Sequence, residues 1–191
     1  MKISRIISAL FCISLFSGCL KLQKNEDYDG APIDPYKDVT CWEFMNSRPD
    51  LFSKMIQGIE ICQMEEYYQT TSKDRTYLLL ADKAIANDVN KATTPANIES
   101  LKNILLFHII KGSYHGYSNL AYTPTFVETF YEGDAMMSIM LYGMASNEDY
   151  IDRVVLMSEC GSSTSIYATG ANHLCKSGAM HILNSKCVYK K

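Results

Sequence analysis

The chain has 191 residues, 18 of them basic and 21 acidic, which gives a net charge of −3 at neutral pH. Lysine and arginine form no cluster, and this argues against nucleic acid as a partner, because phosphate binding needs gathered cations. The length suits one domain with a core of its own, together with short terminal segments.

The first 18 residues predict a secretory signal. Lys2 and Arg5 make a basic start, and residues 6–16 form the apolar run "IISALFCISLF". That run is too short to span a bilayer, which takes about 20 residues. No other segment is long and apolar enough to span one, so we expect attachment to a membrane without a crossing. Removal of residues 1–18 leaves 16 basic and 21 acidic residues, a net charge of −5.

Cys19 directly follows the small residues Ser17 and Gly18. The arrangement resembles the lipobox of bacterial lipoproteins, in which the cysteine is lipidated and becomes the first residue of the mature chain. Leu15, the aliphatic residue, lies one place earlier than usual, so a plain secretory signal with a chance cysteine is the alternative. The resemblance implies lipidation at Cys19, and several acyl chains hold a protein stably where a single chain holds it marginally.

Residues 19–37 are predicted to be a lipidated, flexible tether, since they are polar and contain glycine and proline. An acidic cluster at Glu26, Asp27 and Asp29 lies close behind Cys19. Similar acidic stretches direct some lipoproteins of Gram-negative bacteria to the outer face of the cell, while a solvated linker is the alternative. We expect an outer membrane lipoprotein facing the cell surface, with the periplasmic face as the alternative.

Five cysteines remain after residue 19: Cys41, Cys62, Cys160, Cys175 and Cys187. The odd number leaves at least one thiol unpaired within the chain. No C-x-x-C motif and no zinc-finger spacing occurs. We expect mostly buried free thiols, with a disulfide framework of unknown pairing as the alternative.

Two helices are predicted at the start of the folded part. Thr40 and Glu43 have the spacing of a capping box, which predicts a helix from that point, with Trp42 and Met45 on its buried face. Pro49 is well placed as the first residue of a second helix. Apolar residues recur at helical spacing from there, so the second helix is expected within residues 49–68.

A strand and two further helices follow. Residues 76–80, "TYLLL", form a short apolar run typical of a buried strand, and residues 81–89 predict a short helix. Thr94 followed by Pro95 predicts the start of the next helix, which contains the stretch "LKNILLFHII". Gly112 is expected to end that helix.

The pattern changes after Gly112. Residues 125–131, 135–144, 153–158, 165–169 and 179–189 are rich in strand-forming residues and are separated by glycine-containing turns. Helices come first and strands later, which predicts an α+β fold and not an alternating α/β fold.

Three segments in this order resemble the fasciclin domain. They are a strand-to-helix junction with Asp82 at its start, the pair Phe107-His108 at a helix end, and a hairpin turn at Ser177-Gly178 followed by His181 and Asn184. The resemblance covers residues 38–191 and implies a wedge with a β-sandwich-like core, N-terminal helices and flanking helices. It also implies an extracellular adhesion and binding module, since catalysis is not this family's general role.

The chain departs from the family in two places. Leu80 and Ala81 stand where a proline and a threonine are usual, and Phe107 stands where tyrosine is frequent. We therefore do not extend to this chain the integrin binding that is linked to the Tyr-His region of animal members.

His108 lies in the middle of an apolar run and is the first residue to weigh as a site. Ile98, Leu101, Leu105 and His108 fall along one helical stripe, so the histidine lies on the apolar face. Near a helix end its ring can bond the last carbonyls, and the helix dipole favours any positive charge there. We interpret His108 as a structural link between the helix end and the sheet, in preference to a ligand or a base.

No hydrolase, metalloprotease or P-loop motif occurs. We expect no catalytic residue, no cofactor and no metal, and hence no enzyme. Tyr114, Tyr117 and Tyr122 lie in a loop-like stretch and are the candidate binding residues, because exposed tyrosines suit sugar stacking and protein contacts. Ordinary half-buried tyrosines are the alternative.

Two functions follow from these observations. The first is a lipid-anchored module of the cell envelope that binds or adheres, holding a glycan in a surface uptake system or a cell-surface protein. The alternative is a structural or protein-interaction subunit of an envelope assembly with no small ligand. The sequence does not give the ligand or the oligomeric state.

Overall fold

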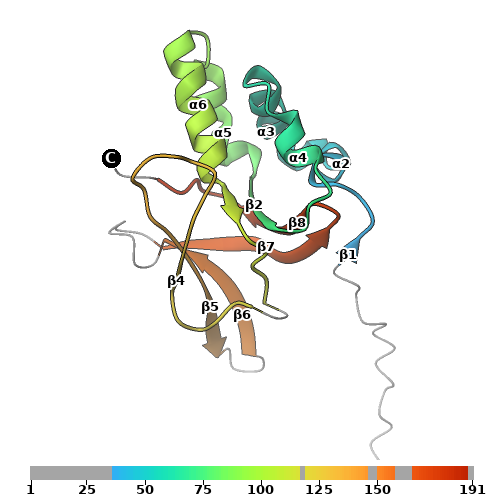
Figure 1. The fold of residues 1–191 in the computed structure, drawn as a ribbon, viewed down its shortest axis with the longest axis vertical. Coiled ribbons are helices and arrows are strands. Elements are labelled where there is room, and N and C mark those ends of the chain that lie inside the picture. The colour runs from blue at the N-terminus through green and yellow to red at the C-terminus, as the bar shows by residue number, and fades with distance from the viewer. Residues whose placement is uncertain (1–35, 117–118, 146–149, 158–164, 189–191) are drawn as a thin grey trace, which may run out of the picture. The chain divides into compact units, whose positions relative to one another are not determined.

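The structure is a computed structural model that describes residues 36–116, 119–145, 150–157 and 165–188. Residues Pro35–Lys191 form a compact unit of their own. Within this unit the helices gather on one side and most of the strands lie on the other (Figure 1). The helices are α2 (Cys41–Asn46), α3 (Pro49–Ile61), α4 (Glu65–Gln69), α5 (Asp82–Lys91) and α6 (Pro95–Phe107).

The strands build one nearly closed, barrel-like sheet. They are β1 (Tyr36–Lys37), β2 (Arg75–Leu80), β3 (Ile109–Lys111), β4 (Thr125–Val127), β5 (Met137–Ala145), β6 (Tyr150–Leu156), β7 (Ile166–Cys175) and β8 (Gly178–Leu183). Their order is β3-β2-β8-β7-β6-β5-β4, and β1 pairs with β7. The β2–β8 and β1–β7 pairs are parallel and the others antiparallel. The predicted α+β class is confirmed.

The segment after β4 brings the two edges of the sheet together. Ile110 of β3 forms a bridge with Thr129. The Lys111 amide donates to the Glu128 carbonyl at 2.8 Å, and the Phe130 amide donates to the Ile109 carbonyl at 2.9 Å. The residues between β4 and β5 therefore lie against β3, and this crossing shapes the candidate site.

The helix starts agree with the sequence. The capping box of Thr40 and Glu43 is present at α2, and the Thr94 side chain accepts from the Asn97 amide at α6. Met45 is fully buried and Trp42 partly so.

The predicted second helix is instead two helices. α3 ends at Ile61, and Gln63 has a positive φ of 53°, which breaks the helix before α4.

The helix predicted to run up to Gly112 ends at Phe107, which is a correction. Ile109 and Ile110 leave it and pair with Tyr77 and Thr76 of β2. Both isoleucines are fully buried in that position. A short β-branched run favours a strand once a partner strand is present, and a helical pattern cannot show that partner. Gly112, with φ of +103°, turns the chain after β3.

Several strand boundaries also differ from the expectation. β4 ends at Val127 and not at residue 131, β5 begins at Met137 and not at residue 135, and β6 begins at Tyr150 and not at residue 153. β7 continues to Cys175, well past residue 169, and its register shifts at two places hide the alternation. β8 ends at Leu183, so the strand predicted for residues 179–189 is shorter. Tyr36 and Lys37, which we assigned to the tether, pair with Leu174 and Cys175.

The core lies between the helices and the central strands. Thr76 to Leu80 of β2 are all fully buried, as predicted for "TYLLL", because both faces of this strand are covered. Cys41, Cys62 and Cys175 are buried free thiols, which confirms the expectation for these three, and Cys187 is buried as well. Cys160 lies outside the described residues. In the described part of the chain, no helix has the length and hydropathy to cross a membrane.

Candidate functional site

His108 joins the end of α6 to the segment after β8. Its Nδ1 lies 2.7 Å from the Ile104 carbonyl oxygen, and the Cys187 amide donates to its Nε2 at 2.9 Å. An Nε2 that accepts is unprotonated, so Nδ1 bears the proton and donates to Ile104. Complete burial lowers the pKa of the ring to about 4. The ring is therefore neutral, and the positive charge that the helix dipole would favour is absent.

His181 has the opposite tautomer and fixes a loop. Its Nε2 lies 2.9 Å from the Tyr114 carbonyl oxygen, and the Asn172 amide donates to its Nδ1 at 3.2 Å. Nε2 therefore bears the proton. Burial lowers the pKa of this ring to about 4 as well. The bond ties the loop after β3 to β8 and to the irregular part of β7, where Asn172 has a φ of 60°.

The remaining residues of the resemblance have packing or linking positions. The Asp82 carboxylate accepts from the Lys54 amide at 2.7 Å and from the Ser53 hydroxyl at 2.5 Å, which links the start of α5 to α3. The Phe107 ring is fully buried and meets His108 edge-on. Asn184 follows β8 and is half-buried.

The structure describes two of the three candidate tyrosines, and their surroundings differ. Tyr114 is half-buried against the core, and its amide donates to the Thr76 hydroxyl at 2.8 Å. Tyr122 is 53% exposed. Tyr117 lies outside the described residues. Gly116 donates to the Asn172 side chain at 2.7 Å, so the stretch is held on the sheet by several bonds. The described residues before Tyr117 therefore have a structural role.

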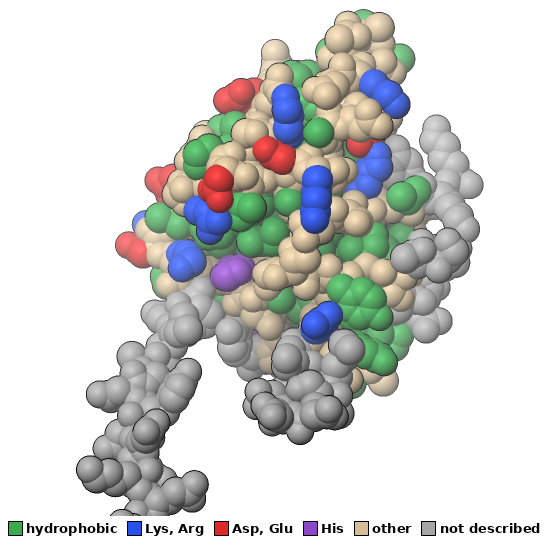
Figure 2. All heavy atoms as spheres, turned by 180° about the vertical axis from the view of Figure 1, so that it is seen from behind, with side chains coloured by type: hydrophobic (Ala, Val, Ile, Leu, Met, Phe, Trp, Pro, Cys, Tyr) green, Lys and Arg blue, Asp and Glu red, His purple; other side chains and the backbone are tan. Residues whose placement is uncertain are grey.

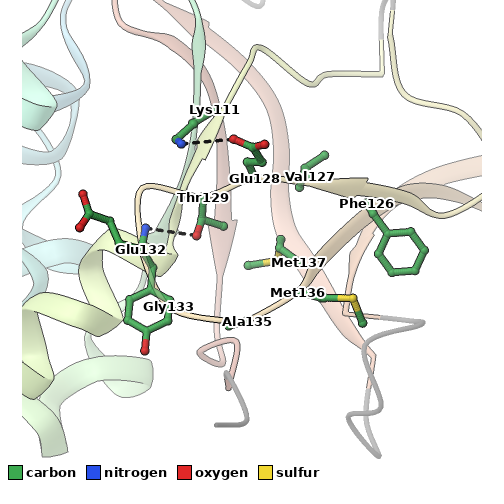
Figure 3. A pocket seen from close by; sticks show the side chains of 11 residues that line it. Lys111, Phe126, Val127, Glu128, Thr129, Glu132, Gly133, Ala135, Met136 and Met137 are labelled. Atoms are coloured by element: carbon green, nitrogen blue, oxygen red, sulfur yellow. Dashed lines mark hydrogen bonds and ion pairs between the residues drawn. The ribbon is translucent and has the colours of Figure 1, made fainter.

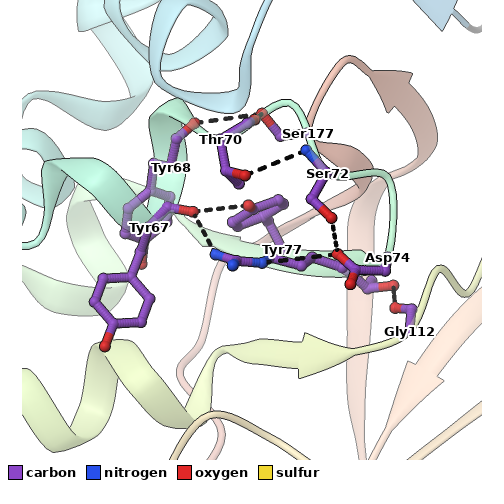
Figure 4. A network of polar contacts seen from close by, with 10 residues as sticks. Tyr67, Tyr68, Thr70, Ser72, Asp74, Tyr77, Gly112 and Ser177 are labelled. Atoms are coloured by element: carbon purple, nitrogen blue, oxygen red, sulfur yellow. Dashed lines mark hydrogen bonds and ion pairs between the residues drawn. The ribbon is translucent and has the colours of Figure 1, made fainter.

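A polar network that the sequence reasoning missed holds the β7–β8 turn (Figure 4). The buried Ser177 hydroxyl donates to the Thr70 carbonyl at 2.6 Å and accepts from the Cys41 amide at 2.9 Å. Gly178 has a φ of +127°, and a Cβ there would collide with the backbone carbonyl of Arg75. This close approach explains the glycine of the motif. The network positions the fold and offers no open site.

A pocket lies inside the β4–β5 connection (Figure 3). It has a volume of about 370 Å³, within the range of ligand pockets. Eleven residues line it: Lys111, Phe126, Val127, Glu128, Thr129, Tyr131, Glu132, Gly133, Ala135, Met136 and Met137. Lys111 comes from β3, and all the others come from β4, β5 and the connection between them.

Two exposed apolar side chains lie on the rim of this pocket. Phe126 is 57% exposed and Met136 is 62% exposed, while Met137 beside them is fully buried. Lys111 and Glu128 form an ion pair at 3.2 Å across the edge where β3 meets the connection. Exposed apolar side chains next to a hollow are typical of contact surfaces.

A second group of exposed rings lies on the neighbouring strands. Tyr142 of β5 and Tyr167 of β7 meet edge-on, with ring centroids 6.4 Å apart. The register places Met140, Val155 and Tyr167 side by side across three strands. Figure 2 shows hydrophobic side chains reaching the surface at several places on its face, with the cations spread among them and not gathered.

A metal site does not emerge among the described residues. No three His, Cys, Asp or Glu side chains there lie close enough together to hold an ion. His173 packs on Phe44 with ring centroids 6.0 Å apart, and burial lowers the pKa of His173 and of His115. Both rings lie close enough to His181 to lower its pKa through their charge, so these three histidines are neighbours, but among the described residues they form no group that could hold a metal.

Comparison with known proteins finds a likeness in fold. No family model and no curated protein matches the chain. Among solved structures 17 chains match, one of them a FAS1 domain pair from the insect cell adhesion molecule fasciclin I. That match has a TM-score of 0.57 and 16% identity, and it covers 78% of this chain and 51% of the other. The chain spans about half the length of that structure. The likeness and the architecture together show that this chain has a fasciclin-like α+β fold.

Proposed function

We propose that the chain is a lipid-anchored, non-catalytic module of the cell envelope that binds or adheres to a partner. The observation that carries this proposal is the β4–β5 pocket with its exposed apolar rim of Phe126 and Met136. Isolated apolar side chains on a surface are ordinary, but two that border a hollow support a contact site. The fold adds support, since the similar structure comes from a cell adhesion molecule.

The positions of the histidines support a non-catalytic role. His108 and His181 are buried, neutral and bonded to backbone groups through both ring nitrogens. A general base needs a ring that can reach a substrate and take up a proton near working pH. These two rings hold the fold together and are not available for that task.

Two partner classes are compatible with the pocket. A protein partner is our first candidate, because aromatic and methionine side chains such as Phe126 and Met136 are enriched at protein interfaces. A glycan, held for a surface uptake system, is the second. The exposed Phe126 ring favours it, since sugars stack on aromatic rings.

Binding experiments separate the two classes. Residues 20–191 are applied to glycan arrays and polysaccharide affinity gels, beside the variants Phe126→Ser and Tyr142→Ser. Glycan retention that Phe126→Ser abolishes and Tyr142→Ser preserves supports the glycan function. Uniformly negative arrays, with a protein recovered by crosslinking in cells, exclude the glycan and support the protein partner.

The anchor is tested separately. A Cys19→Ala variant is expected to leave the membrane fraction, and a variant that stays there contradicts lipidation. Protease treatment of intact cells distinguishes the two faces of the outer membrane: we expect cleavage of the wild type, whereas protection of the chain indicates the periplasmic face.

A further inference from the structure

The β4–β5 pocket has an apolar end and an acidic end. Figure 3 shows Phe126 and Met136 at one end and Glu132 with the neighbouring turn at the other. Asp134 lies between two lining residues, Gly133 and Ala135, and is exposed like Glu132. A ligand in the pocket therefore has apolar side chains at one end and the negative charge of Glu132 near the other.

The charge of the rim is negative. Among the described residues that line the pocket, Lys111 is the sole cation, and its ammonium group lies 3.2 Å from Glu128. That pair is neutral as a unit, so Glu132 leaves the lining with a net charge of −1, and the exposed Asp134, between two lining residues in the sequence, adds a further negative charge nearby. The rim disfavours an anionic ligand and attracts a cation, whereas a neutral sugar gains nothing from its charge.

The acidic turn is held in position by packing. The Tyr131 ring meets the buried Phe107 ring edge-on at 6.1 Å, and the Tyr131 amide donates to the Thr129 hydroxyl at 3.2 Å. A Cβ on Gly133 would overlap the Tyr131 ring, so glycine lets the turn close over it. The backbone that carries Glu132 and Asp134 is therefore anchored through Tyr131, which lowers the cost of ordering this segment on binding.

From these observations we infer that the pocket binds a polypeptide segment of a partner protein in which a lysine or arginine stands beside an apolar side chain. The cation lies toward Glu132 and Asp134, and its apolar neighbour lies against Phe126 and Met136. A hollow of about 370 Å³ accommodates one long side chain and part of its neighbour. This inference rests on the proposed binding function and names the chemistry of the partner.

The test uses two peptides as probes. One alternates arginine with leucine, and the other has citrulline in place of each arginine, which keeps the shape and removes the charge. Residues 20–191 are used, because Pro35–Lys191 forms a compact unit of its own. Fluorescence anisotropy of labelled peptide is measured at low and high ionic strength. We expect the arginine peptide to bind about 10-fold more tightly, with an affinity that falls as salt rises.

Matched variants locate the binding. Glu132→Gln with Asp134→Asn removes two rim charges, and Glu60→Gln with Glu99→Gln removes two exposed charges from the helices. We expect the rim variant to weaken the arginine peptide by about 5- to 10-fold, the scale of two exposed ion pairs, and the helix variant to leave it within about 2-fold. Met136→Ser is expected to weaken both peptides. Thermal melting checks that each variant is folded.

The outcomes separate this inference from the proposed function. Equal binding of both peptides, equal loss in the two double variants, or no binding below about 1 mM overturns the cationic partner. If glycans bind in a manner that depends on Phe126 while the peptides do not, the binding module stands and the inference falls. If neither peptides, glycans nor a crosslinked protein binds at this pocket, both fall.

Discussion

Acidification from pH 7 to pH 5 should strongly destabilise this fold, because two buried histidines must stay neutral. The pKa of His108 and of His181 is about 4 in the folded chain, against 6.5 for an unburied ring. Below pH 6.5 the unfolded chain takes up protons that the buried rings accept only near pH 4. The unfolded state is therefore favoured as the pH falls through this window, and stability is lost from 6.5 toward 4.

The magnitude follows from these values. One pKa unit corresponds to about 1.4 kcal/mol, so each ring contributes about 2 kcal/mol less at pH 5 than at pH 7, and the two together about 4 kcal/mol. Single domains are stable by about 5–15 kcal/mol, so this is a large fraction of the total. The pKa values of His115 and His173 are lowered by burial too, which acts in the same direction.

Urea unfolding of residues 20–191 at pH 7 and pH 5 measures this difference. The variant His181→Gln, an amide that can still donate and accept, is expected to lose about half of the pH dependence, about 2 kcal/mol. A free energy of unfolding that is unchanged between the two pH values would refute the reasoning. So would a His181→Gln variant that keeps the full dependence.

Three further predictions concern the glycines and the first helix cap. Gly178→Ala is expected to lower the free energy of unfolding by about 2–4 kcal/mol, because its positive φ and the Arg75 carbonyl leave no room for a Cβ; a melting temperature equal to wild type contradicts this. Thr40→Ala should cost about 1 kcal/mol through loss of the capping box, measured by urea unfolding, and Thr40→Ser should restore most of it. Gly133→Ala should displace the Tyr131 ring and weaken the arginine peptide several-fold; an unchanged affinity would show that the turn does not shape the pocket.

The sequence predicted the parts of the fold that depend on neighbouring residues. The capping box at Thr40 and the buried run "TYLLL" need only local spacing and hydropathy, and both are present. The predicted end of the helix at Gly112 was wrong because it depends on a contact that is distant in the sequence. Ile109 and Ile110 continue a helical pattern, and only the distant strand β2 makes them a strand.

The partners of the two buried histidines could not be predicted. The Cys187 amide that bonds to His108 lies 79 positions along the chain, and the Tyr114 carbonyl lies 67 positions from His181. An apolar stripe suggests that a histidine is buried, but it does not say which backbone group meets its ring. Tyr114 looked available because its stretch is polar, and those polar groups in fact bind it to the sheet.

The pocket was missed because a long-range crossing forms it. The connection between β4 and β5 reaches β3 through the Ile110–Thr129 bridge, which no local pattern reveals. One signal was present in the sequence. Met137, Ile139 and Leu141 alternate inward along β5, and Met136, which directly precedes this strand, has the opposite phase and is exposed. An exposed methionine so close in sequence to the acidic residues on either side of Gly133 could have indicated the site.

Site-specific photocrosslinking in intact cells tests the central claim, that this chain binds a partner through the β4–β5 pocket, most directly. A photoreactive phenylalanine analogue is placed at Met136 in one variant and at Glu99, exposed on α6, in the other. We predict a discrete crosslinked product from position 136 that disappears when Glu132→Gln and Asp134→Asn are added, and none from position 99. Products of equal yield from both positions, or none from position 136, would contradict the account.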